Sequence, residues 1–145
     1  MPSAIPRHAL LTCASIAAGL DAQAVGAALA RGLRAGGAPA PDVLTLPRRP
    51  GADPELLARL DFDARMLAAR AVVIAVARLA PRGLARTVAF EIATRARQSG
   101  VPCYAVAARG ALDSFDARML DLQVVMVAAT ARELTNAGRK LAGIV

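Results

Sequence analysis

Apolar runs and amphipathic segments alternate along most of this chain. Short runs rich in Val, Ile, Leu and Ala predict five strands, at His8–Ala14, Asp42–Leu46, Ala71–Ala77, Val101–Ala107 and Gln123–Ala129. Between the third and fourth runs, apolar residues recur four apart and predict a helix, at Leu84, Val88, Ile92 and Ala96. Apolar strands that alternate with helices are typical of a parallel sheet covered on both faces. We therefore expect a three-layer, doubly wound α/β sandwich of the flavodoxin or Rossmann type.

Capping and turn residues mark the ends of the first and last predicted helices. Asp21 is a favourable N-cap for the first helix, and Gly36-Gly37 supplies its stop. Thr130 and Glu133 have the spacing of a capping box at the start of the last helix. The pattern leaves the strand order open, because both 2-1-3-4-5 and 3-2-1-4-5 fit alternating strands and helices.

The chain length suits one domain, and we expect residues 1–145 to form a single α/β domain. No apolar run approaches the ~20 residues that a membrane helix needs. The first residues, MPSAIPRHALLT, do not have the pattern of a signal peptide. We expect a cytoplasmic protein that does not associate with membranes.

The net charge of +7 raises the question of a nucleic-acid partner. Lys140 is the only lysine, and the arginines are spread along the whole chain. No basic cluster is interleaved with aromatic residues. We therefore expect scattered, solvated arginines rather than a nucleic-acid surface.

The two cysteines, Cys13 and Cys103, each lie inside an apolar run and lack CxxC spacing. A metal site needs three or four ligands, and His8 is the sole histidine. Buried, reduced thiols are therefore expected, and no metal site is predicted.

The loop after the first strand, in the segment CASIAAGLDA, is where sheets of this type usually bind their ligands. An enzyme that binds phosphate there needs glycines where the backbone comes close to the phosphate, and a cation. The loop has only Gly19 as a useful glycine, and Ser15 lies outside any GxSxG elbow. Neither GxGxxG after the first strand nor GxxxxGK[ST] anywhere is present. Because these motifs are absent, the sequence predicts no catalytic residue and no resident cofactor.

Four segments of the chain read CASIAAGLDA, LARGLRAGG, VLTLPRRPGAD and AVVIAVARLAPRGLARTVAFEIATRARQSGVPCYAVAAR. Together they resemble the first domain of the type-1 glycerate kinase family. The last segment, Ala71–Arg109, matches the family pattern without a gap, and its helix followed by GVP is the most specific part. The family inserts a second domain that residues 47–67 replace here. The resemblance implies a minimal glycerate-kinase-like domain.

The departures from the family pattern fall on its polar positions. The family's first-loop Asp and Lys correspond to Ala14 and Ala17, whereas its Ser is retained as Ser15. The later GEG triplet is replaced by Ala75-Val76-Ala77, and its Arg is retained as Arg78. Phosphoryl transfer depends on such positioned charges. The resemblance therefore implies a pseudoenzyme that binds a small organic acid or phosphate, or associates with another protein.

The sequence also allows two alternatives. One is residual ATP- and Mg-dependent glycerate kinase activity, with or without a partner chain that supplies the missing domain. The other is a structural homo-oligomer, because Gly26, Ala27 and Ala30 would permit close packing of the first helix. For a bound ligand, the candidate residues are Ser15, Gly19, Arg78 and Arg109, which lie at or after predicted strand ends. An arginine there can hold a carboxylate or phosphate bidentately.

The hexapeptide Phe-Asp-Ala-Arg-Met-Leu occurs twice, at Phe62–Leu67 and Phe115–Leu120. Each copy precedes an apolar run. We interpret the repeat as a short helix that leads into a strand rather than as a duplicated functional motif.

Overall fold

A computed structural model of the chain describes residues 7–47, 54–79, 88–110 and 122–145. Its sheet has five parallel strands in the order β2-β1-β3-β4-β5. The strand bounds are β1 Ala9–Cys13, β2 Asp42–Thr45, β3 Ala71–Leu79, β4 Cys103–Gly110 and β5 Leu122–Val127. Of the two orders that the sequence allows, the chain adopts 2-1-3-4-5, the flavodoxin-like one.

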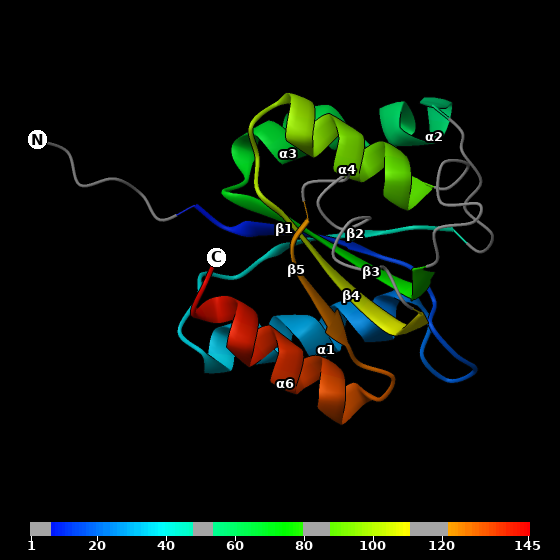
Figure 1. Cartoon of the computed structure of the whole chain (residues 1–145), viewed down its shortest axis with the longest axis vertical. Helices are drawn as coiled ribbons and strands as arrows, with labels where there is room; N and C mark the ends of the chain where they lie inside the picture. Colours follow the sequence, from blue (N-terminus) through cyan, green and yellow to red (C-terminus); the bar gives the residue numbers. More distant parts are fainter. Residues whose placement is uncertain (1–6, 48–53, 80–87, 111–121) are drawn as a thin grey trace, which may run out of the picture.

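Helices cover both faces of this sheet (Figure 1). On one face lie α1 (Ala22–Ala35) and α6 (Ala131–Ala142), and on the other lie α2 (Pro54–Arg59), α3 (Phe62–Ala68) and α4 (Val88–Gln98). The predicted three-layer, doubly wound α/β sandwich is therefore confirmed. Within the described part of the chain, no helix is both long and apolar enough to cross a membrane.

Each face of the sheet has its own apolar core. Val72 and Ile74 of β3 belong to the core under α2, α3 and α4, whereas Val73 and Ala75 belong to the core under α1 and α6. This alternation follows from the two-residue period of a strand. The buried Thr12 hydroxyl donates a 3.1 Å hydrogen bond to the Val73 carbonyl, so burial leaves it satisfied.

Glycines let α1 approach its neighbours closely. A Cβ on Gly32 would overlap the carbonyl oxygen of Thr135, and one on Gly138 would lie 2.5 Å from that of Leu29. A Cβ on Gly26 would lie 2.6 Å from Cγ1 of Val43. Gly26, which the oligomer alternative assigns to an external interface, therefore packs α1 against β2 within the chain.

The helix caps lie where the sequence predicts them. The Asp21 carboxylate accepts a 2.8 Å bond from the Ala24 amide, and Thr130 Oγ1 accepts one of 3.1 Å from the Glu133 amide. Gly36 is the C-cap of α1. The residues that were expected to lead into α4, including Leu84, lie outside the described residues.

Two strands run further than predicted. β3 continues past Ala77 to Leu79, and β4 continues past Ala107 to Gly110. The two extensions pair with each other in register, so each strand supplies the hydrogen-bonding partner of the other. A local apolar pattern cannot reveal such pairing, because Arg78 and Arg109 interrupt the apolar runs.

The first copy of the repeated hexapeptide forms α3, a short helix before β3, as expected. Phe62 and Met66 are buried in the core. Asp63 and Arg65 form ion pairs with residues of other elements. The copy therefore has a structural role. The second copy, Phe115–Leu120, lies outside the described residues.

Candidate functional site

The candidate site lies where β1 and β3 are neighbours. From β1 the chain passes through α1 to the outer strand β2, and β3 is followed by α4 and then β4 on the other side. The two helices lie on opposite faces of the sheet (Figure 1). Adjacent strands whose connections leave in opposite directions create a crevice at their carboxyl ends, where α/β sheets of this kind bind ligands.

A pocket of about 270 Å³ is present at this switch point. Residues from β1, β2, β3 and α4, or directly after them, line it: Ala14, Ser15, Leu46, Val76, Ala77, Arg78, Val88 and Ala89. Most of these side chains are apolar. The lining that the structure describes offers one hydroxyl and one guanidinium, and no carboxylate, imidazole or amine.

Ser15, which the sequence singles out, supplies the hydroxyl of the pocket. Its Oγ donates a 3.3 Å hydrogen bond to the Leu20 carbonyl, which also accepts the Ile16 amide at 3.0 Å. The hydroxyl can therefore turn toward a ligand without leaving the Leu20 carbonyl unpaired, because the amide bond remains.

Arg78 lines the pocket, and Arg109 stands beside it on the next strand. The two residues are partners in the parallel register of β3 and β4, and both side chains are exposed. Among the described residues, ion pairs involve Arg59, Arg65 and Arg95 but neither of these two. Arg109 is not among the described residues that line the pocket.

Gly19, the fourth candidate, has a conformational role in the loop before α1. Its φ is +83°, in the region that glycine adopts without strain. It sits in a tight turn in which the Leu20 amide donates to the Ala17 carbonyl at 3.0 Å. Gly19 is exposed and is not among the described residues that line the pocket.

At the opposite, amino end of the sheet, Arg65 is held by Asp42. Its Nε and Nη2 donate to the two carboxylate oxygens at 2.9 and 2.7 Å, and further bonds reach the carbonyls of Val43 and Leu60. The hydrogen bonds from Arg65 hold the pKa of Asp42 below its usual value. The shallow depression of about 510 Å³ here, which His8 also lines, therefore has its arginine already engaged.

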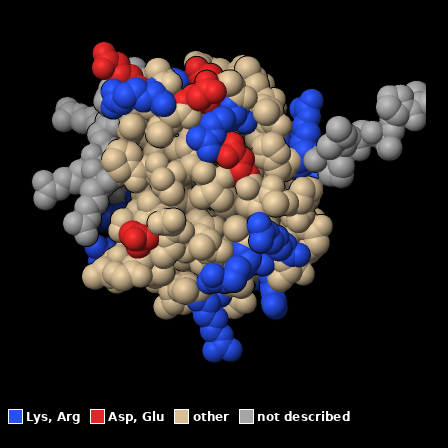
Figure 2. Space-filling model, turned by 180° about the vertical axis from the view of Figure 1, so that it is seen from behind, with Lys and Arg blue, Asp and Glu red and all other residues tan. Residues whose placement is uncertain are grey.

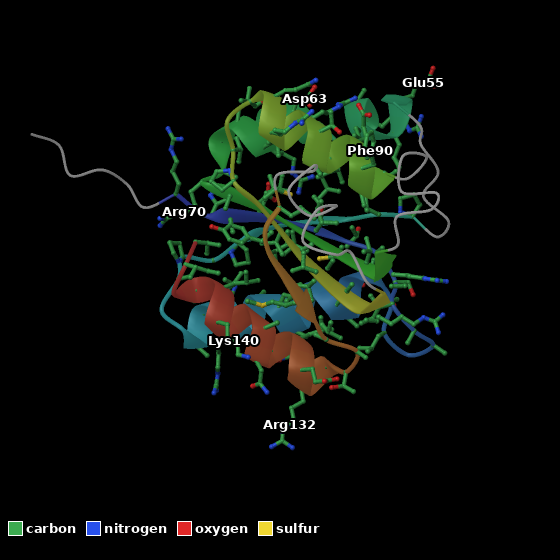
Figure 3. All side chains as sticks on the ribbon, viewed as in Figure 1. Glu55, Asp63, Arg70, Phe90, Arg132 and Lys140 are labelled. Atoms are coloured by element: carbon green, nitrogen blue, oxygen red, sulfur yellow. The ribbon has the colours of Figure 1, made fainter. Side chains whose placement is uncertain are left out.

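A second set of ion pairs ties α3 to α4. Arg95 donates to Asp63 at 3.1 Å and to Glu91, one turn earlier on α4, at 2.9 Å. Asp63 points outward on this layer (Figure 3). Arg95, Asp63 and Glu91 are thus engaged with one another within the chain.

The outer surface of α1 and α6 is basic. Figure 2 shows Lys and Arg gathered over this part of the molecule, and the exposed cations are Arg31, Arg34, Arg132, Arg139 and Lys140. Arg132 and Lys140 point away from α6 (Figure 3). Three of the five lie in the last turn of their helix, where a cation favours the helix dipole. Helix stability therefore accounts for much of this pattern.

The two cysteines, Cys13 and Cys103, are not among the described residues that line the pocket. Both are buried thiols, as expected, and burial raises the pKa of Cys13 to about 12. A thiol so hard to ionise is a poor nucleophile. Over the described ranges, no three His, Cys, Asp or Glu side chains gather in a way that could hold a metal ion.

Comparisons with known proteins inform the fold. No family model matches the chain, and no curated protein matches it. The X-ray structure of an oxidoreductase from Corynebacterium diphtheriae superposes with a TM-score of 0.51, covering 98% of each chain at 13% identity. Similarity at this identity shows a shared fold of the same size and no more.

Two of the residues that the sequence proposes, Ser15 and Arg78, line this pocket, but the sequence does not indicate its apolar walls. Leu46, Val88 and Ala89 look like ordinary core residues in the sequence. Only the strand order, which places β1 beside β3, reveals that they surround a crevice.

Proposed function

We propose that this chain is a glycerate-kinase-like domain that binds a small organic acid and does not catalyse phosphoryl transfer. The observation that carries the proposal is the apolar pocket at the switch point, with Ser15 and Arg78 as its polar groups. Its volume of about 270 Å³ lies just below the range of ~300–1,000 Å³ that is usual for small-molecule sites, so it suits a small ligand.

The chemistry of the lining matches an acid with a short hydrocarbon body. Val76, Val88 and Ala89 can cover the hydrocarbon part, which gains about 25 cal/mol for each Å² removed from water. The guanidinium of Arg78 suits a carboxylate, which it can meet with two parallel hydrogen bonds. The Ser15 hydroxyl adds a third polar contact.

The same lining favours binding over catalysis. A phosphoryl-transfer site positions cations or metal ions against the phosphates and orients the attacking group. Ala75-Val76-Ala77 stands where the resembled family has a glycine-rich acidic triplet, and here these residues continue β3. Val76 and Ala77 form part of the pocket wall. An apolar strand in this place supports a binding role.

Calorimetry with a small acid and its neutral analogue tests the proposal. We expect butyrate to bind and butyramide not to bind, because only the acid can form the ion pair with Arg78. Arg78→Gln should weaken butyrate binding tenfold or more, as expected for the loss of a charged hydrogen bond worth about 1.5–3 kcal/mol. Arg31→Gln, which removes the same charge from the outer surface of α1, is the matched control and should bind as the parent does.

Two results would overturn this function. One is butyrate binding that Arg78→Gln and Arg31→Gln leave equally unchanged, or no binding of butyrate at all. The other is turnover in a coupled assay with ATP, Mg²⁺ and glycerate, which would instead establish kinase activity.

A further inference from the structure

We infer that the switch-point site selects small acids that carry two negative charges, with Arg78 holding one charge and Arg109 the other. This inference rests on the proposed function, because it assigns a ligand class to the same pocket. A monoanionic acid engages only Arg78, so it leaves the neighbouring Arg109 without a role. Arg109 would be the residue that determines specificity.

The sheet places both arginines on the same face. Val76 and Ala107 are register partners one pleat earlier, and both pack into the core under α2, α3 and α4. Side chains two residues apart along a strand share a face. Arg78 and Arg109 therefore project from the face that carries the pocket wall Val76.

The spacing of the two strands suits a short dianion. Neighbouring strands lie about 4.7–4.9 Å apart, and the two arginines are directly opposite each other in the register. A ligand that seats one anionic group at Arg78 and extends across the sheet toward β4 meets the second guanidinium. Dicarboxylates and phosphate monoesters share this chemistry of two charges on a small body.

The local charge balance also favours a dianion. Like charges directly opposite each other on neighbouring strands are destabilising. In the parts of the chain that the structure describes, no carboxylate forms an ion pair with Arg78 or Arg109. Arg65 and Arg95, by contrast, each have carboxylate partners. A bound dianion would neutralise the pair at the carboxyl end of the sheet.

Calorimetry at constant ionic strength tests the inference with ligands matched in size. Succinate and butyrate have the same carbon skeleton and differ by one carboxylate, and propyl phosphate supplies the dianion in tetrahedral form. We expect succinate to bind at least tenfold more tightly than butyrate. Arg109→Gln should reduce this preference to threefold or less, because it weakens succinate binding far more than butyrate binding. Arg31→Gln should preserve the preference, which separates a local effect from the loss of net charge.

The outcomes separate this inference from the proposed function. Equal affinity for succinate and butyrate, with binding still dependent on Arg78, would overturn the dianion preference and keep the pocket. The same holds if Arg109→Gln lowers both affinities by one common factor. Failure of both acids to bind, or binding that Arg78→Gln does not change, would overturn the pocket itself. Propyl phosphate binding more tightly than succinate would identify phosphate monoesters as the preferred dianion, and the reverse would identify dicarboxylates.

Discussion

The arginines at the two ends of the sheet differ in their surroundings. At the amino end, Arg65 is fixed by both oxygens of Asp42 and by two backbone carbonyls. At the carboxyl end, Arg78 and Arg109 are exposed, adjacent, and outside the ion pairs of the described residues. An arginine side chain therefore stabilises the fold at the amino end, whereas the two arginines at the carboxyl end are exposed.

This difference shows how function can be inferred without a catalytic motif. An arginine that the chain itself satisfies adds to stability and has little left to offer a ligand. Two arginines placed side by side, with no carboxylate partner among the described residues, carry a small cost in stability, which a bound anion can offset. Replacing each kind of arginine should therefore change stability at one end and binding at the other.

The largest effect on stability should come from Arg65. Arg65→Met should lower the free energy of unfolding by about 1–2 kcal/mol, because Asp42 and two carbonyls lose a charged donor. The side chains of Arg65 and Asp42 are 30% and 29% exposed, so solvent screening keeps the loss of stability below that of a fully buried ion pair. Arg78→Met should change the same quantity by no more than about 0.5 kcal/mol. Urea unfolding of both variants checks the contrast, and equal losses would contradict it.

A smaller effect should appear when pH removes the charge of Asp42. The hydrogen bonds from Arg65 lower the pKa of Asp42 in the folded protein, whereas the unfolded chain has a value near 3.9. The stability from this pair is therefore present above pH ~4 and is lost as pH falls through the lowered folded-state pKa.

Asp42→Asn isolates this contribution. The difference in unfolding free energy between the parent and this variant should shrink as pH falls below ~4. Urea titrations across this range measure it. A difference that stays constant down to pH 2 would show that the ion pair does not stabilise the amino end.

The smallest effect should come from the repulsion between Arg78 and Arg109. Arg109→Gln should raise the free energy of unfolding by a few tenths of a kcal/mol at low salt, because opposite like charges are unfavourable. The gain should vanish near 1 M salt, where the Debye length is about 3 Å. Parallel melts at the two salt concentrations measure this change, and a loss of stability at low salt would indicate that Arg109 has a partner.

Much of the fold can be predicted from local signals. Neighbouring residues determine the helix caps at Asp21 and Thr130 and the apolar runs of the strands. The sequence alone therefore predicts their positions. The strand order and the length of β3 depend on pairing between distant segments. For this reason the sequence predicts a strand that ends at Ala77, whereas β3 reaches Leu79.

In the candidate site, too, local features could be predicted from the sequence, whereas features that depend on pairing between strands could not. Ser15 and Arg78 follow or end strands, so their place near the carboxyl edge could be predicted. Gly19 lies in the expected loop, yet its positive φ accounts for the glycine without a ligand. The register of Arg78 with Arg109 needs two strands to be aligned, which no single segment encodes.

The most direct test of the central claim is an NMR titration of the ¹⁵N-labelled chain with succinate. We predict that the amides shifting most belong to Ser15, Ala77, Arg78, Val88 and Ala89, at the carboxyl ends of β1 and β3 and the start of the described part of α4. Amides around Asp42 and Arg65, at the amino end, should remain unchanged. The largest shifts at the amino end, or no shifts at any succinate concentration, would contradict a binding site at the switch point.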